Sequence, residues 1–147
     1  MPTGSGHCAD VAGGLKHATE LSWSSPVRLC ILFADAPCHG TQYHDVPDPY
    51  PEGCPLKVDP TEMIYKLHSL GVDFYFIRIK RVTDKMVSVF KTAVDRMAAR
   101  DGKRKSVGGP GFVVHNLGSK ENTFVPAVVE SVKGSASAIN LRVEKYS

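Results

Sequence analysis

The residue best placed for chemistry in this sequence is Asp35, which directly follows the apolar run Val27–Ala34. A run of this kind is typical of a strand that is covered on both faces. In open α/β sheets, ligands bind beyond the carboxyl ends of the strands, so this carboxylate could hold a hard cation directly or through water. The alternative is that Asp35 only caps or hydrogen-bonds the loop behind it, and position alone leaves the two interpretations even.

The loop that follows is long, polar and rich in proline, which suits a binding surface better than a simple connection. It contains side chains of the types that bind zinc. These are Cys38, His39, His44 and Cys54. Their spacing matches no common zinc arrangement. The alternative is that His39, Tyr43 and His44 form hydrogen bonds that order the loop over the end of the sheet.

Nucleophilic catalysis is the weaker interpretation of the same loop. Cys38 and His39 are neighbours in sequence and project in different directions, whereas catalytic Cys–His pairs generally meet across the fold. We therefore expect no catalytic and no cofactor-binding residue, and no enzymatic activity. We expect instead an interaction loop that presents four side chains to a protein partner. They are Cys38, His39, Tyr43 and His44.

Hydrophobic patterning predicts three strands that position this loop. They cover Val27–Ala34, Asp73–Ile79 and Phe112–Leu117. Helices fall before, between and after these strands, which favours right-handed crossovers and a parallel sheet with helices on both faces. The predicted fold class is therefore α/β, a three-layer, Rossmann-like arrangement with only three strands.

Four helix starts are indicated by capping residues. They are Asp10, Asp59, Thr83 and Thr123. Pro60 at the first helical position supports the second start, and Gly71 marks the end of that helix. The segment 100–105 is basic and is best interpreted as a solvated connection.

Length and composition agree with an ordinary globular domain. The chain has 147 residues, 42% hydrophobic and 22% charged, and a net charge of +3 that is too small to indicate a nucleic-acid partner. No apolar stretch reaches the roughly 18–20 residues of a membrane span, and the first residues do not resemble a secretory signal. Four cysteines in a chain of this length do not indicate a disulfide framework, so we expect a cytoplasmic protein with reduced cysteines.

The predicted sheet has an unusual edge. Consecutive strands would lie side by side, which leaves the most apolar strand, Val27–Ala34, at the edge. Edge strands are normally short, charged or interrupted by proline. We therefore expect this strand to favour self-association unless another segment covers it.

Several segments resemble the von Willebrand factor type A domain, and more narrowly the variant that accompanies alpha-type protein kinases in eukaryotic microbes. The resemblance covers roughly residues 8–134, with tails at 1–7 and 135–147. It is carried by Asp10–Leu15, Arg28–Gly40 with its Ala-Asp-Ala-Pro-Cys-His-Gly string, Gly71–Ile77, Phe112–Gly118 and Phe124–Val132.

This resemblance implies a larger domain with strand order 3-2-1-4-5-6, of which this chain would hold the last three strands as an N-terminally truncated copy. The metal-ion-dependent adhesion site of the family would then be incomplete. Asp35 corresponds to one of its ligands and Asp10 lies where another is usually found, while the Asp-x-Ser-x-Ser motif is missing from the sequence. Mg²⁺ or another divalent cation would bind only if the missing ligands were supplied.

The sequence therefore predicts a non-catalytic binding module for an unidentified protein partner, with divalent-metal dependence in the complete domain. The alternative is a regulatory segment of an alpha-type protein serine/threonine kinase whose catalytic domain lies outside this chain.

Overall fold

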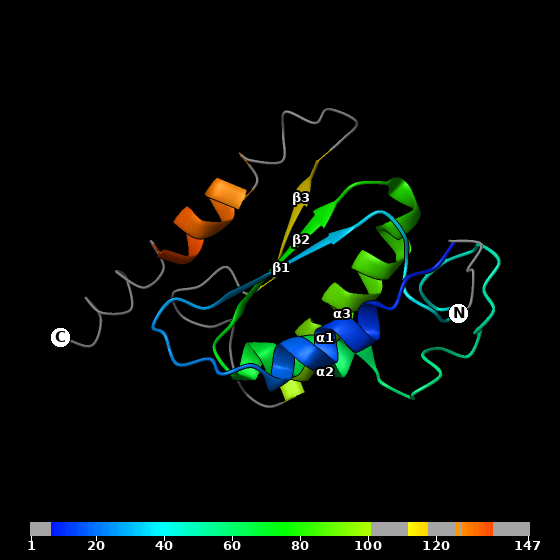
Figure 1. Cartoon of the computed structure of the whole chain (residues 1–147), viewed down its shortest axis with the longest axis horizontal. Coiled ribbons are helices and arrows are strands. Elements are labelled where there is room, and N and C mark those ends of the chain that lie inside the picture. The colour runs from blue at the N-terminus through cyan, green and yellow to red at the C-terminus, as the bar shows by residue number, and fades with distance from the viewer. Residues whose placement is uncertain (1–6, 101–111, 118–125, 127, 137–147) are drawn as a thin grey trace.

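The centre of the molecule is a three-stranded parallel sheet whose strands follow one another in sequence order (Figure 1). The computed structural model describes residues 7–100, 112–117, 126 and 128–136. The strands are β1 (Leu29–Ala34), β2 (Asp73–Arg78) and β3 (Phe112–Asn116). Residue Leu29 lies opposite Asp73, and Phe74 lies opposite Phe112. All three expected strands are confirmed, each slightly shorter than predicted.

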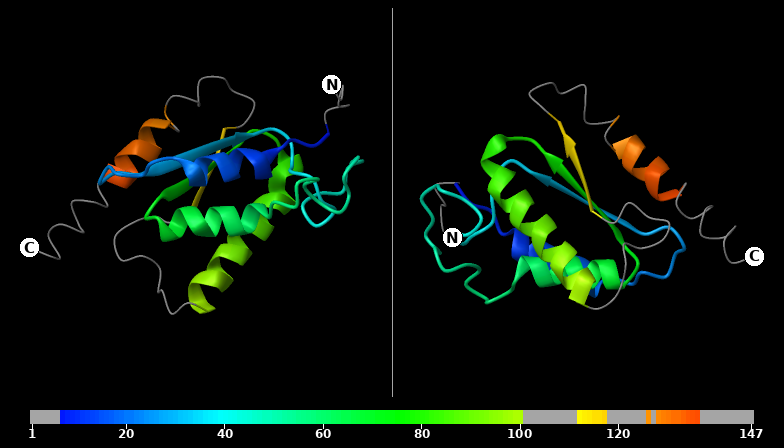
Figure 2. Two further views of the ribbon diagram at one scale, coloured as in Figure 1. Left: turned by 60° about the horizontal axis from the view of Figure 1, so that its bottom comes forward. Right: turned by 180° about the vertical axis from the view of Figure 1, so that it is seen from behind.

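Helices lie on both faces of this sheet (Figure 2). Helices α1 (Val11–Glu20), α2 (Pro60–Ser69) and α3 (Asp84–Arg100) lie on one face, and the helical residues 128–136 lie on the other. The hydroxyls of Tyr75 and Ser135 are 2.9 Å apart and join β2 to that second helical layer. The predicted α/β, three-layer, Rossmann-like class is confirmed.

Local capping determines where two of the helices begin. The Asp10 carboxylate accepts a hydrogen bond from the Gly13 amide at the start of α1. The Asp59 carboxylate accepts from the Thr61 amide at the start of α2. Both starts are as predicted, because a short acidic side chain supplies the acceptor that the first turn of a helix lacks.

The start of α3 also lies where the sequence predicted it, with Thr83 directly before the first helical residue. A short 3₁₀ helix, η1 (Arg81–Thr83), precedes it, and α3 begins at Asp84. The hydroxyl of Thr83 donates to the Lys80 carbonyl at 2.8 Å. Thr83 is fully buried at this junction, so its hydroxyl is satisfied locally within the tight turn.

The core lies between the sheet and the α1–α3 face. Strand β2 is buried almost throughout, as expected for the central strand of a covered sheet. Its inward side chains pack in one cluster with side chains from α1, α2 and α3. The fully or nearly fully buried members include Leu15, Ile64, Leu67, Phe74, Phe76, Met86 and Phe90.

Strand β1 lies at an edge of the described sheet, as predicted, and pairs there with β2 alone. Its side chains are mostly half-buried although the strand is almost entirely apolar. A groove of about 350 Å³ runs between α1 and β1 and is lined by apolar side chains that include Leu15, Ile31 and Phe33. The described structure thus leaves apolar surface along the outer side of β1.

Some expectations concern residues outside the described part of the chain. They are the helix start at Thr123 and most of the basic segment 100–105. The domain bounds of 8–134 stay a prediction. Among the described helices, none has the length and apolar character that crossing a membrane requires.

Candidate functional site

The carboxylate of Asp35 lies just beyond β1, as expected, and its side chain is 61% exposed. Its Oδ2 is 3.6 Å from Nζ of Lys80, an exposed ion pair of a kind that contributes little to stability. The carboxylate of Asp10 is engaged in capping α1. Within the described part of the chain, neither residue belongs to a group of three or more metal-ligating side chains. Their role as metal ligands therefore stays a prediction.

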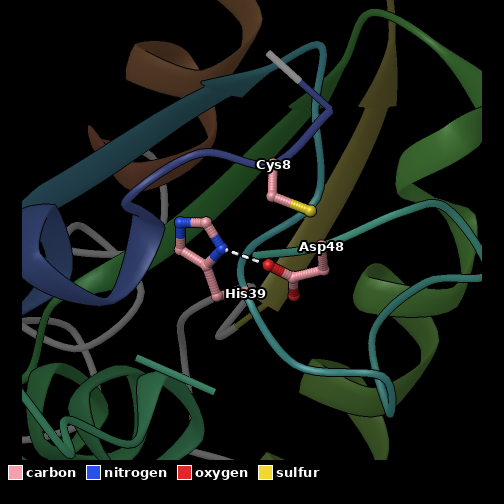
Figure 3. A group of neighbouring side chains, drawn as sticks. All are labelled: Cys8, His39 and Asp48. Atoms are coloured by element: carbon pink, nitrogen blue, oxygen red, sulfur yellow. Dashed lines mark hydrogen bonds and ion pairs between the residues drawn. The ribbon is translucent and has the colours of Figure 1, made fainter. Parts of the chain in front are cut away.

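An isolated parallel bridge between Ala9 and Cys38 joins the N-terminal segment to the loop after β1. The Ala9 amide donates to the Pro37 carbonyl at 2.9 Å. Successive side chains of an extended segment point to opposite sides, so Cys38 enters the core and its neighbour His39 points away from it. Cys8, next to Ala9, lies on the same side as His39 (Figure 3). The structure therefore does not assemble the zinc arrangement through Cys38 and Cys54 that the loop sequence suggested.

The buried carboxylate of Asp48 organises the loop, and its side chain is only 1% exposed. Each of its two oxygens accepts two hydrogen bonds. The donors are His39 Nδ1 (2.6 Å) and the Tyr50 amide (2.8 Å) to Oδ1, and His44 Nε2 (2.9 Å) and the Gly40 amide (2.7 Å) to Oδ2. Of the interpretation in which His39, Tyr43 and His44 order the loop through hydrogen bonds, the part that concerns the two histidines is thus confirmed.

These hydrogen bonds hold Asp48 in its ionised form. Burial by itself raises the pKa of Asp48, but the donors from Gly40, His39 and Tyr50 outweigh burial and hold the pKa well below its ordinary value. The nearby thiol of Cys8 behaves in the opposite way. Burial and the negative charge of Asp48 both raise the pKa of the Cys8 thiol.

The arrangement does not provide an activated cysteine nucleophile. Sγ of Cys8 is 3.4 Å from Nε2 of His44, but Nδ1 of His44 accepts the Val46 amide and therefore carries no proton. The proton of a neutral His44 must then be on Nε2, which donates to Asp48 and cannot remove a proton from the thiol. At Cys38, burial raises the thiol pKa far above its ordinary value. Neither thiol has the environment of a catalytic cysteine.

The outer face of the loop borders an open cavity of about 600 Å³. His39 and Tyr50 line it together, with their ring centroids 5.0 Å apart in an edge-to-face contact. Tyr43 also reaches the cavity, but its ring packs on Phe90 and burial raises the pKa of Tyr43 to about 12. Of the four residues predicted for the interaction loop, Cys38, Tyr43 and His44 thus face inward and only His39 is partly exposed.

Two residues of this cluster, Asp48 and Cys8, were not among the site residues predicted from the sequence. Asp48 lies between Pro47 and Pro49 and four residues after His44, and this spacing was the available sequence signal that Asp48 and His44 could interact. Cys8 carries no local signal, because its position depends on the bridge between residues that are distant in sequence.

Comparison with known proteins identifies one informative relative. The chain is similar to part of an alpha-protein kinase. That protein is the alpha-protein kinase vwkA of Dictyostelium discoideum, which is 31% identical over 138 residues. The match covers 88% of this chain and 20% of the kinase, so the chain spans about one fifth of the length of its relative. No protein-family model and no solved structure matches the chain.

Proposed function

We propose that this chain is a non-catalytic protein-interaction module, a partial von Willebrand factor type A-like domain associated with an alpha-type protein kinase. The observation that carries this proposal is the match to one fifth of an alpha-protein kinase. Four free cysteines support a reducing compartment such as the cytoplasm.

Two features of the fold support the type A-like part of this proposal. The three parallel strands run in sequence order, and the apolar edge of β1 would suit a further strand of a larger sheet. Asp35 lies beyond the carboxyl end of β1, where such a domain would use a carboxylate. In the complete domain, Asp35 would be one ligand of Mg²⁺ and a carboxylate of the partner would complete the metal shell.

The loop around Asp48 is the binding surface that we propose. Its inner side is fixed by the hydrogen bonds to Asp48, and the loop exposes Tyr50 (41%) and Leu56 (77%) to solvent. A surface that is ordered before binding loses less conformational entropy when a partner docks. Exposed aromatic and apolar side chains on such a surface are typical anchors for a protein partner.

The experiment compares two leucines that are both exposed. Leu56 lies in the proposed surface, and Leu21 (63% exposed) lies at the far end of α1 and serves as the matched control. Proteins captured from the source cells by the wild-type chain would be identified, purified and titrated against Leu56→Asp and Leu21→Asp. We expect at least a tenfold loss of affinity for Leu56→Asp alone. Equal affinities for the two variants would contradict the proposed surface.

The metal-dependent version has a separate test. Asp35→Ala should weaken partner binding in the presence of Mg²⁺ and have no effect after chelation with EDTA. If neither EDTA nor the substitution changed the affinity, partner binding would not depend on a metal, and the proposed interaction surface would be unaffected by this result.

A second candidate function is regulation of the kinase itself, which the match to vwkA favours. In that case this region would act on an alpha-kinase catalytic domain that lies outside the residues of this chain. Purified catalytic domain of an alpha-kinase from the same organism would be assayed for phosphorylation of myelin basic protein with and without the chain. A change in rate that Leu56→Asp abolishes would favour regulation, and an unchanged rate would favour binding to another protein.

A further inference from the structure

We propose that Cys8, His39 and Asp48 form a zinc-binding site that fastens the N-terminal segment to the loop after β1. One ligand atom of each side chain, a sulfur, an imidazole nitrogen and a carboxylate oxygen, lies within 4.8 Å of the others (Figure 3). In the described part of the chain, this is the group of three metal-ligating side chains that comes together. The proposal stands independently of the proposed function, because it rests on the arrangement of these three side chains and not on the match to the kinase.

The donor set favours zinc over the hard cations. Mg²⁺ and Ca²⁺ prefer shells made of oxygen, whereas a thiolate and an imidazole together suit Zn²⁺. Asp48 is already ionised and buried, so it offers one negative charge in a place that exposes little of it to water. A Cys8 thiolate would supply the second negative charge, and the two would balance the +2 charge of the ion.

The geometry requires only small movements. Ligands in a tetrahedral zinc shell are roughly 3.3–3.8 Å apart, given bond lengths of about 2.0–2.3 Å. The present separations range from 2.6 Å, between His39 Nδ1 and Asp48 Oδ1, up to the 4.8 Å limit for the group. Changes of about 1.5 Å or less are therefore sufficient, and rotation of the partly exposed Cys8 and His39 side chains can provide them.

Proton balance is simple at this site. When zinc binds, the Cys8 thiol loses its proton, and this proton is released to the solvent. His39 now donates through Nδ1 to Asp48, so that nitrogen carries a proton in the metal-free site. When Nδ1 binds the ion, the proton moves to Nε2 and the ring stays neutral.

His44 acts as a positioning residue. Its Nδ1 accepts the Val46 amide, so its Nε2 keeps a proton and holds Oδ2 of Asp48 at 2.9 Å. Partners that orient a ligating carboxylate in this way typically contribute 10–100-fold to metal affinity. The fourth position of the zinc shell is left for water.

The test uses the full chain without a histidine tag, stripped of metal with EDTA and titrated with Zn²⁺ against a chromophoric chelator. Co²⁺ serves as the spectroscopic probe, since a thiolate ligand gives a charge-transfer band. We expect one equivalent of either metal and a thiolate band for the wild-type chain. Cys8→Ser should abolish the band and weaken Zn²⁺ binding by more than about 100-fold, and His44→Gln should weaken it by about 10–100-fold with the band retained.

Two controls match these variants. Cys54→Ser makes the same change in a partly buried cysteine of the loop that contains His39 and Asp48, and His7→Ala removes the exposed histidine beside Cys8. Both should bind like the wild-type chain. Zinc affinity that survives Cys8→Ser, or that is lost in Cys54→Ser, would overturn the proposal. So would a wild-type chain that binds less than one equivalent, and the Asp48 cluster would then be a hydrogen-bonded structural element only.

Discussion

Replacement of Asp48 by asparagine tests the organisation of the loop most stringently, because the two side chains have nearly the same size. The carboxylate accepts four hydrogen bonds, two from histidine rings and two from the Gly40 and Tyr50 amides. An asparagine side chain retains one acceptor oxygen and turns an NH₂ group towards two of these donors. Two donors then lose their acceptor, and the remaining two lose the assistance of the negative charge.

The expected cost follows from these contacts. A buried donor without a partner costs about 1–3 kcal/mol, so Asp48→Asn should lower the free energy of unfolding by about 3 kcal/mol. The loop cannot open separately at small cost, because Cys38 and Tyr43 from the same loop are members of the core. With a urea m-value of about 2 kcal/mol/M, the unfolding midpoint should fall by about 1.5 M.

The assay is urea unfolding followed by far-UV circular dichroism in the presence of EDTA, so that metal binding does not contribute. Asp45→Asn is the matched control, because Asp45 lies in the same loop but is exposed and pairs with Lys85. Its midpoint should equal that of the wild-type chain within error. If Asp48→Asn lost no more stability than Asp45→Asn, the view that Asp48 organises the loop would be refuted.

Three further predictions concern the rest of the molecule. Tyr75→Phe leaves Ser135 Oγ buried without its partner and should lower the free energy of unfolding by about 1–2 kcal/mol in thermal unfolding. If Tyr75→Phe cost no more in the wild-type chain than in a Ser135→Ala background, the Tyr75 and Ser135 hydroxyls would not interact. Iodoacetamide at pH 8 should modify Cys54 and spare Cys38, because burial raises the pKa of the Cys38 thiol and keeps it protonated. Equal labelling of the two cysteines, measured by mass spectrometry, would contradict the position of Cys38 in the core. In sedimentation velocity the wild-type chain should self-associate as its concentration rises, and Ile31→Lys on β1 should suppress the association. A wild-type chain that stays monomeric would show that another segment covers the β1 edge.

The elements of the fold could be predicted from sequence because their signals are local. Asp10 and Asp59 cap helices within three residues of themselves, and the apolar run ending at Ala34 is read directly as a strand. The start of α3 was predicted by Thr83, which directly precedes Asp84, whereas the 3₁₀ turn before it was not predicted. Local signals thus indicated the type of each element and the helix starts, whereas the predicted strands were slightly too long.

The site was less predictable because its contacts are not local. Cys8 and His44 are 36 residues apart in sequence, and they meet only because Ala9 pairs with Cys38. The same bridge turns Cys38 into the core, which is why the cysteine adjacent to His39 is not the one that shares its site. The histidines of the loop could be recognised from the sequence, whereas their common partner, Asp48, was determined by tertiary folding.

The most direct test of the proposed interaction surface is site-specific photo-crosslinking in the source cells. A benzoylphenylalanine residue would replace Leu56 in one variant and Leu21 in the other, since both positions are exposed. We predict a discrete crosslinked product from position 56, identified as one protein by mass spectrometry, and none from position 21. The same set of products from both positions, or no product from position 56, would contradict the proposal that this loop binds a protein partner.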